Sequence, residues 1–234
     1  PRFAFEKFKG CSSVLNTSMK SVGEAMAIGR CFEESFQKAI RSLEIGFSGW
    51  GFDTPEQKID SLEVELLLRS PSPQRIMAIR TAMIQGRTNK EINELSNIDP
   101  WFLSKLRNII DVHNRFLKGR KLGEIDPNSL FEIKRLGFSD RQIAWVTKTK
   151  ELDVRNHRKE LSITPIYKTV DTCAAEFASN TPYHYSTYER PFKKIIGRDI
   201  IEDEDIQNEV NIEIVKKVMI LGGGPNRIGQ GIEF

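Results

Sequence analysis

The sequence is poor in the residues that build disulfide frameworks and metal centres. It has 3 cysteines and 3 histidines in 234 residues, all far apart, and it contains no Cys-x-x-Cys pair. An odd, scattered set of cysteines argues against a disulfide framework and a structural zinc site, and it favours a reducing compartment. We therefore expect no metal site in this chain.

Long apolar runs are also missing. No stretch approaches the roughly 18 apolar residues that a membrane-spanning helix needs, and no signal-peptide pattern opens the chain. The hydrophobic content of 39% and the charged content of 29% are ordinary for a globular protein. We therefore expect one or two folded domains and no membrane partner.

A strong excess of one charge is absent too. The net charge is +3, and residues 54–161 hold 20 Lys and Arg against 15 Asp and Glu. Two short segments, starting at Thr88 and Ser139, could imitate helix-turn-helix units. So small a surplus is typical of solvated helix surface, which predicts no nucleic-acid partner. The alternative is a stand-alone helical interaction module that binds nucleic acid weakly.

A strand is predicted over residues 19–29. Val22, Met26 and Ile28 alternate at period two, which places them on one face. Glu24 falls on the same face. Because burying a carboxylate without a partner is costly, Glu24 belongs at a strand end, at a bulge or beside a polar cavity.

An amphipathic helix is predicted directly after this strand. Acidic residues occupy its first turn and basic residues its later turns, which suits the helix dipole. Its apolar residues recur at helical spacing: Phe32, Phe36, Ala39, Ile40 and Leu43. A turn-rich break between Gly46 and Pro55 then marks a boundary.

Residues 54–161 are predicted to be helical throughout. Four N-cap and proline pairs indicate helix starts, and glycines at 86, 119 and 137 indicate helix ends. The paired starts are Thr54-Pro55, Ser72-Pro73, Asp99-Pro100 and Asp126-Pro127. The predicted helices lie near 56–68, 72–85, 88–96, 99–118, 127–136, 139–148 and 150–161. An irregular connector, residues 162–214, follows them.

The chain ends on a strand-like run, residues 215–221, and a glycine-rich loop. Gly224 and Gly229 have the spacing of a P-loop, but Gln230 stands where Lys is required. Arg227 occupies the third glycine position of a dinucleotide fingerprint. What remains is a turn at a helix N-terminus, suited to an anion or to close packing. Its residues are Gly222, Gly223, Gly224, Asn226, Arg227 and Gly229.

A strand and turn of this kind open a βαβ unit, whose helix and next strand would have to follow. The chain also begins at Pro1 rather than at Met. We therefore expect further chain on both sides of this sequence.

Four stretches together resemble the middle of the carbamoyl-phosphate synthetase large subunit: PRFAFEKF at 1–8, MKSVGEAMAIGR at 19–30, VDTCAAEF at 170–177 and residues 222–234. The resemblance implies a mainly α fold, in which a helical oligomerisation domain is flanked by α/β pieces of two synthetase halves of the ATP-grasp type. Residues 1–45 would end the first half and 54–161 would form the oligomerisation domain. Residues 162–214 would connect it to the second half, which 215–234 would open.

The resemblance implies an ATP-dependent ligase that makes carbamoyl phosphate from bicarbonate, glutamine-derived ammonia and two ATP, for arginine and pyrimidine biosynthesis. The ATP-grasp cores, which bind ATP with Mg²⁺ or Mn²⁺, would lie outside these residues. The fragment would then hold no catalytic residue, metal or cofactor, and it would be inactive alone.

The same resemblance implies an internal tunnel that carries the labile carbamate between the halves. Its lining would include Met19, Glu24, Gly231 and Glu233. The implied partners are the rest of the large subunit, a glutaminase small subunit and further copies of the helical domain. The implied location is the cytoplasm, or the plastid stroma in a photosynthetic eukaryote.

Overall fold

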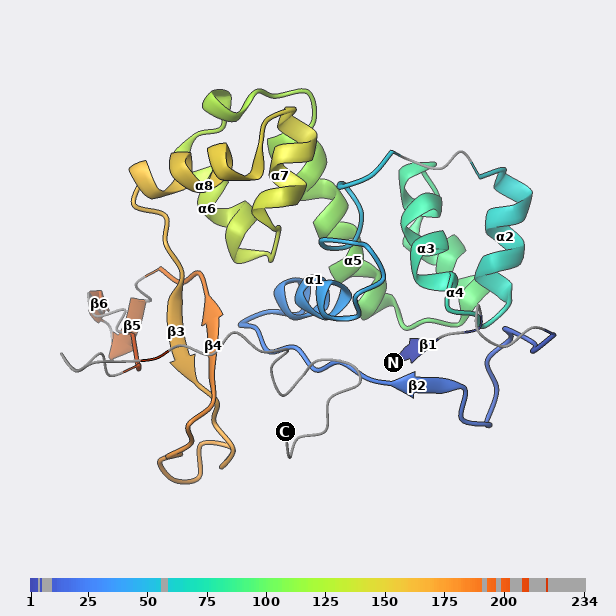
Figure 1. Cartoon of the computed structure of the whole chain (residues 1–234), viewed down its shortest axis with the longest axis horizontal. Helices are drawn as coiled ribbons and strands as arrows, with labels where there is room; N and C mark the ends of the chain where they lie inside the picture. The colour runs from blue at the N-terminus through green and yellow to red at the C-terminus, as the bar shows by residue number, and fades with distance from the viewer. Residues whose placement is uncertain are drawn as a thin grey trace.

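The computed structural model describes residues 1–3, 5, 10–55, 59–190, 208–210 and 218, together with the backbone of 193–196 and 199–202. Within these residues the fold is mainly α, with eight α-helices and three two-stranded sheets. The predicted fold class is confirmed. Figure 1 shows the helices gathered above the strands, with helix α1 (Phe32–Ser42) beneath helix α5 (Pro100–Val112).

The helices of residues 54–161, which we call the helical block, agree with the predicted helices to within a few residues. The exception is the first one, which starts later than predicted. A π-helical turn, η2, continues α5, and a 3-10 turn, η3, precedes α6. Besides α1 and α5, the helical elements are α2 (Ser61–Arg69), α3 (Arg75–Ile84), α4 (Asn89–Ser96), η2 (His113–Leu117), η3 (Leu122–Glu124), α6 (Pro127–Arg135), α7 (Asp140–Thr147) and α8 (Glu151–Glu160).

Two of the four predicted helix starts are correct. Asp99 and Asp126 accept hydrogen bonds from the first turns of α5 and α6, and each is followed by a proline at the first helical position. The start at Thr54 is wrong, because α2 begins seven residues later, where the Asp60 side chain accepts from the backbone N–H of Leu62. The start at Ser72 is also wrong, since its side chain caps nothing and α3 begins at Arg75.

The predicted helix ends are confirmed at three glycines. Gly86, Gly119 and Gly137 have φ angles of +92°, +74° and +86°, a left-handed region that suits residues without a Cβ. Gly137 also passes close to the backbone of Glu34, which brings the end of α6 against helix α1.

The apolar core runs through the helical block and includes the segment before it. Its largest fully buried side chains include Trp50 and Phe138, and the Trp50 ring packs edge-on against Phe36 of α1. The Trp50 indole N–H donates to the carbonyl of Ile76 in α3 at 3.0 Å. Helix α1 also packs on α5. Helix α1 and the helices of the block therefore share one apolar core.

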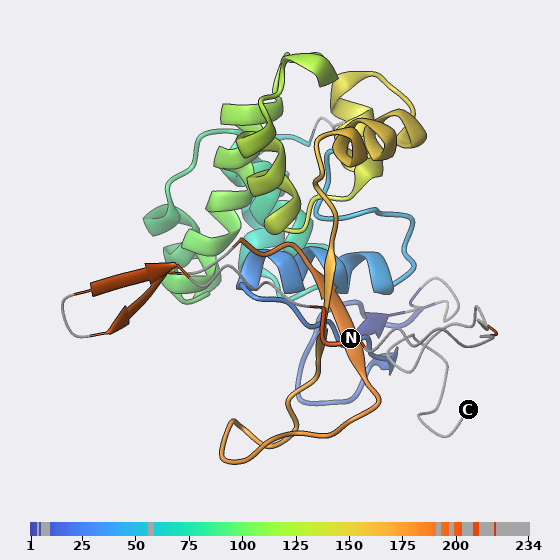
Figure 2. The same cartoon turned by 90° about the vertical axis from the view of Figure 1, so that its left-hand side faces the viewer.

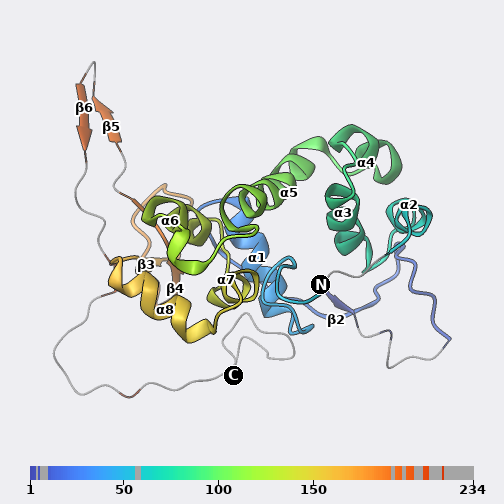
Figure 3. The same cartoon turned by 90° about the horizontal axis from the view of Figure 1, so that it is seen from above.

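The strands form three antiparallel pairs. β1 pairs with β2, β3 with β4, and β5 with β6; their bounds are β1 (Arg2–Phe3), β2 (Ser21–Gly23), β3 (Ile166–Thr169), β4 (His184–Thr187), β5 (Lys193–Ile196) and β6 (Asp199–Glu202). Figure 2 shows the β3–β4 hairpin running down past α1, and Figure 3 shows β5 and β6 standing apart from the helices.

The strand predicted over 19–29 is wrong in length. Only Ser21–Gly23 forms a strand, and it pairs with the two residues of β1. Val22 and Met26 are about half exposed, so the apolar face expected there is not covered by the described part of the chain.

Candidate functional site

The predicted tunnel residues fall into two groups. Met19 is 87% exposed, and Glu24 is exposed directly after the end of β2, one of the three positions expected for it. Gly231 and Glu233 lie outside the described residues, as do the loop residues Gly222, Gly223, Gly224, Asn226, Arg227 and Gly229. The tunnel lining therefore stays a prediction.

Glu34 lies on the polar face of helix α1 and is buried. One carboxylate oxygen of Glu34 accepts from the Arg30 backbone N–H at 2.7 Å and from the Thr187 hydroxyl at 3.0 Å. The other pairs with the Lys38 ammonium at 2.8 Å. Because Thr187 belongs to β4, the carboxylate ties the hairpin to α1.

Lys38 extends the same connection. Its ammonium donates to the carbonyls of Ile28 at 2.9 Å and Ser186 at 2.5 Å. It also lies 5.7 Å from the centre of the Tyr185 ring. All its donors therefore have partners from the segment before α1, from α1 itself and from β4.

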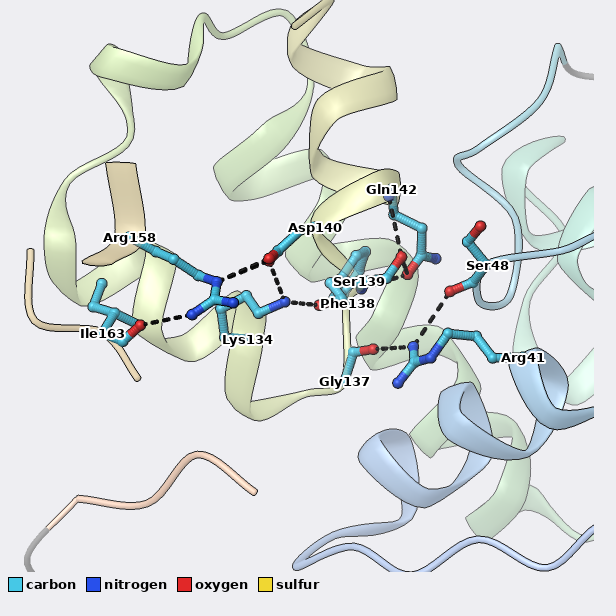
Figure 4. A network of polar contacts seen from close by, with 10 residues as sticks. All are labelled: Arg41, Ser48, Lys134, Gly137, Phe138, Ser139, Asp140, Gln142, Arg158 and Ile163. Atoms are coloured by element: carbon cyan, nitrogen blue, oxygen red, sulfur yellow. Dashed lines mark hydrogen bonds and ion pairs between the residues drawn. The ribbon is translucent and has the colours of Figure 1, made fainter. Parts of the chain in front are cut away.

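The next turn of α1 binds the end of α6. The Gln37 amide nitrogen donates to the carbonyl of Leu136 at 2.8 Å. Arg41 donates through Nη1 to the carbonyls of Gly137 at 2.8 Å and Ser48 at 3.3 Å. The last carbonyls of a helix have no partner within it, so α1 satisfies carbonyls at the end of α6. Figure 4 shows the two bonds that Arg41 makes.

Gln142 of α7 adds to the contacts between α1 and the end of α6. We call the contacts of Gln37, Arg41 and Gln142 the junction. The Gln142 side-chain oxygen accepts from the Ser139 backbone N–H at 2.9 Å, which forms a capping box. Its amide nitrogen donates to Gln37 Oε1 at 3.0 Å and to the carbonyl of Gly51 at 2.7 Å. The Gln142 side chain thus joins α7, α1 and the turn-rich break between Gly46 and Pro55.

A buried ion network lies beside the junction. Asp140 pairs with Lys134 at 2.7 Å and with Arg158 at 2.9 Å, while Lys134 also donates to the carbonyl of Phe138 at 2.7 Å. Burial lowers the pKa of Lys134 to about 8, even though Asp140 opposes the shift. Burial acts to raise the pKa of Asp140, but Lys134 and Arg158 together hold that pKa below its ordinary value.

These contacts hold segments together and show no catalytic pattern. The carboxylates of Glu34 and Asp140 are each committed to cations, so neither is placed as a general base. Within the described ranges, no group of three or more His, Cys, Asp and Glu side chains could hold a metal ion. Nor does any helix in that part of the chain have the length and apolar character to cross a membrane.

Sequence reasoning missed this junction for an identifiable reason. Glu33 and Glu34 fit the expected charge of a first helical turn, and nothing local shows that other segments cover them. The available signal was that α1 carries many polar residues and is followed by the turn-rich break. The glycines of that break allow its backbone to approach α1 closely.

The helical block matches the family model described as the carbamoyl-phosphate synthetase large chain, oligomerisation domain, over residues 24–162. That range begins at Glu24 and includes α1, in agreement with the packing of α1 into the block. The division into 1–45 and 54–161 stays a prediction.

Known relatives match the chain along its whole length. It is 54% identical over 234 residues to the carbamoyl phosphate synthase large chain of Nostoc sp., of which it covers 20%. It is 52% identical over 235 residues to the arginine-specific large chain, chloroplastic, of Arabidopsis thaliana, of which it covers 18%. The chain thus spans about a fifth of the length of these relatives, and it belongs to the carbamoyl-phosphate synthetase large-chain family.

Proposed function

We propose that the chain is the central, non-catalytic part of an ATP-dependent ligase that makes carbamoyl phosphate. The observation that carries this proposal is the match of the oligomerisation-domain model to residues 24–162, a range that coincides with one packed helical block. Glutamine-derived ammonia, two ATP and a divalent metal belong to the proposed reaction of the whole protein. Its product would serve arginine and pyrimidine biosynthesis.

A comparison of the 234-residue chain with the full-length protein tests this role. We expect bicarbonate-dependent ATP hydrolysis from the full-length protein and none from the chain alone, because the proposed ATP-grasp cores lie outside it. Turnover by the purified, tag-free chain would contradict the proposed boundaries.

In the cell the whole protein would lie in the cytoplasm or the plastid stroma, associated with a glutaminase small subunit.

We also propose that Met19, Glu24, Gly231 and Glu233 line a passage for carbamate in the full-length protein. The described structure is consistent with this, because Met19 and Glu24 are exposed and free to face another part of a longer chain. A passage must exclude bulk water, since carbamate is labile in it.

The substitution Gly231→Phe in the full-length protein tests the passage. It should leave bicarbonate-dependent ATP hydrolysis largely intact while carbamoyl phosphate formation collapses. Gly123→Phe is the control, because a side chain at Gly123 would meet open space. A parallel loss of both activities in the soluble Gly231→Phe protein would mean that the glycine serves only the backbone turn.

Self-association is the third part of the proposal. Leu62 and Leu66 lie one turn apart on α2 and are 68% and 61% exposed. Apolar side chains at this spacing form a stripe on one helix face. Because α2 lies inside the matched oligomerisation domain, we propose that this stripe packs against a second copy of the chain.

A further inference from the structure

A small cavity lies where α1, the α6–α7 corner (residues 136–139) and the β3–β4 hairpin meet. Its volume is about 190 Å³, several times the roughly 30 Å³ that one water molecule occupies in the liquid. Its lining includes Glu34, Lys38, Arg41, Lys134 and Tyr188, and the rest of the wall is Gly137, Phe138, Ser139, Pro165 and Ser186.

The charges around this cavity do not balance. Lys38, Arg41 and Lys134 line it, and Arg158 lies behind Lys134 in the ion network. Against these four cations stand two carboxylates, Glu34 and Asp140. Glu34 is already bound to Lys38, and Asp140 to Lys134 and Arg158. One of the two surplus positive charges therefore belongs to Arg41, and the other to the Lys134 and Arg158 pair that shares Asp140.

Arg41 has donors to spare. Its Nη1 binds two carbonyls, while its Nη2 and Nε donate to no acceptor within the described part of the chain. Figure 4 shows the guanidinium between α1 and the α6–α7 corner, with no bond drawn to its second terminal nitrogen. Burial lowers the pKa of Arg41, as expected for a cation without a full set of partners.

Lys134 also lines the cavity and supplies a further donor. Its ammonium has three N–H groups, and two of them bind Asp140 Oδ1 and the carbonyl of Phe138. The third remains beside the Tyr188 ring, whose centre lies 5.4 Å away. Arg41 and Lys134 thus both bring cationic donors to the cavity.

We propose that this cavity binds a small oxyanion of the size and charge of phosphate or bicarbonate, held by the free edge of Arg41 and by Lys134. A guanidinium edge offers two parallel N–H groups that match the oxygens of such an anion. The anion would neutralise a partly buried surplus of charge that otherwise costs free energy. Because the wall combines α1, the helical block and the hairpin, the bound anion would also hold these three parts together.

Inorganic phosphate is the probe that tests the site. The 234-residue chain is titrated at constant ionic strength, with binding followed calorimetrically and the thermal midpoint recorded at each concentration. We expect saturable binding and a midpoint that rises with phosphate, since a ligand of the folded state stabilises it. Bicarbonate, sulfate, acetate and chloride are titrated in parallel, and we expect the oxyanions to exceed chloride.

Three variants connect this binding to the cavity. Arg41→Gln should abolish saturable binding, and Arg41→Lys should weaken it about tenfold by keeping the charge and losing the guanidinium edge. Arg155→Gln, on the exposed side of α8, should bind as the native chain does. If Arg41→Gln fails to fold, the Arg41→Lys affinity decides. Equal phosphate effects in all variants, or no saturation in the native chain, would overturn the proposal.

Discussion

The side chains of Gln37 and Gln142 meet across 3.0 Å, 105 positions apart in the sequence. Both are fully buried, and both also bind backbone carbonyls: Gln37 that of Leu136, and Gln142 that of Gly51. Gly49 packs against the same amide so closely that a Cβ there would lie 2.3 Å from Gln142 Nε2. The hydrogen bonds of Gln37 and Gln142 therefore hold together α1, the turn-rich break and the α6–α7 corner.

Replacing Gln142 tests how much this contact stabilises the fold. Gln142→Ala leaves Gln37 Oε1, the Gly51 carbonyl and the Ser139 backbone N–H without this partner inside the protein. We expect the free energy of unfolding to fall by about 3 kcal/mol, measured by urea denaturation. Gln85→Ala removes an exposed bond to the Ile59 carbonyl and should cost about 0.5 kcal/mol. Similar losses in the two variants would contradict a special role for Gln142.

Alanine substitutions at Gly137 and Gly119 distinguish the cost of backbone strain from the cost of close packing. Gly137 and Gly119 both have positive φ, so alanine strains both, at a cost of about 1 kcal/mol each. Only at Gly137 does the new Cβ also meet backbone, lying 2.8 Å from Glu34 Cα. Since α1 would have to move, Gly137→Ala should cost about 2 kcal/mol more than Gly119→Ala in chemical denaturation. Equal costs would show that α1 can shift freely.

The helices could be predicted from the sequence because their signals are local. Asp99 and Asp126 before prolines, and glycines at the helix ends, act within one turn of their own position. The predicted start at Thr54 failed because a cap and a proline also suit a turn, and Asp60 provided the cap further on.

The junction could not be predicted because it depends on contacts between distant segments. Glu34 is buried by Thr187 and Lys38, and nothing near Glu34 in the sequence indicates Thr187. The strand predicted over 19–29 failed for a related reason, since the length of a strand depends on pairing with another segment, and within the described residues β1 pairs with Ser21–Gly23 alone.

Charge placed on α2 should prevent self-association. In the double variant Leu62→Glu with Leu66→Glu, two carboxylates would enter a contact that the native leucines fill, and burying them there is costly. We expect the native chain to sediment as a dimer or a larger species, and the variant as a monomer with an unchanged helical circular dichroism spectrum.

Leu152→Glu controls for added negative charge elsewhere on the helical block. Leu152 lies on α8 and is 60% exposed, much like Leu62 and Leu66. This variant should sediment as the native chain does. An unchanged oligomer in the α2 double variant would place the contact on another face, and a monomeric native chain at high concentration would argue against self-association altogether.

The buried Lys134 should make the stability of the fold depend on pH. Its pKa is about 8 in the folded chain and 10.5 ordinarily, so between these values the unfolded chain binds a proton that the folded chain lacks. Stability contributed by this group therefore rises with pH through that window. The groups facing it are Asp140 on α7, Arg158 on α8, Arg41 on α1 and Tyr188 after β4. Burial raises the pKa of Tyr188 to about 12, so above pH 10 its effect is opposite in sign.

Comparing the native chain with Lys134→Met isolates the lysine, because Tyr188 and Asp140 remain in both. We expect the native chain to gain up to about 2 kcal/mol relative to Lys134→Met between pH 7 and pH 10, measured by urea denaturation at each pH. The methionine keeps most of the packed volume, so the variant should fold. Lys90→Met, at an exposed position of α4, should keep a constant difference from the native chain. If the Lys134→Met difference is equally constant, the buried ammonium keeps its proton throughout this range, and Asp140 compensates its burial more fully than the lowered pKa implies.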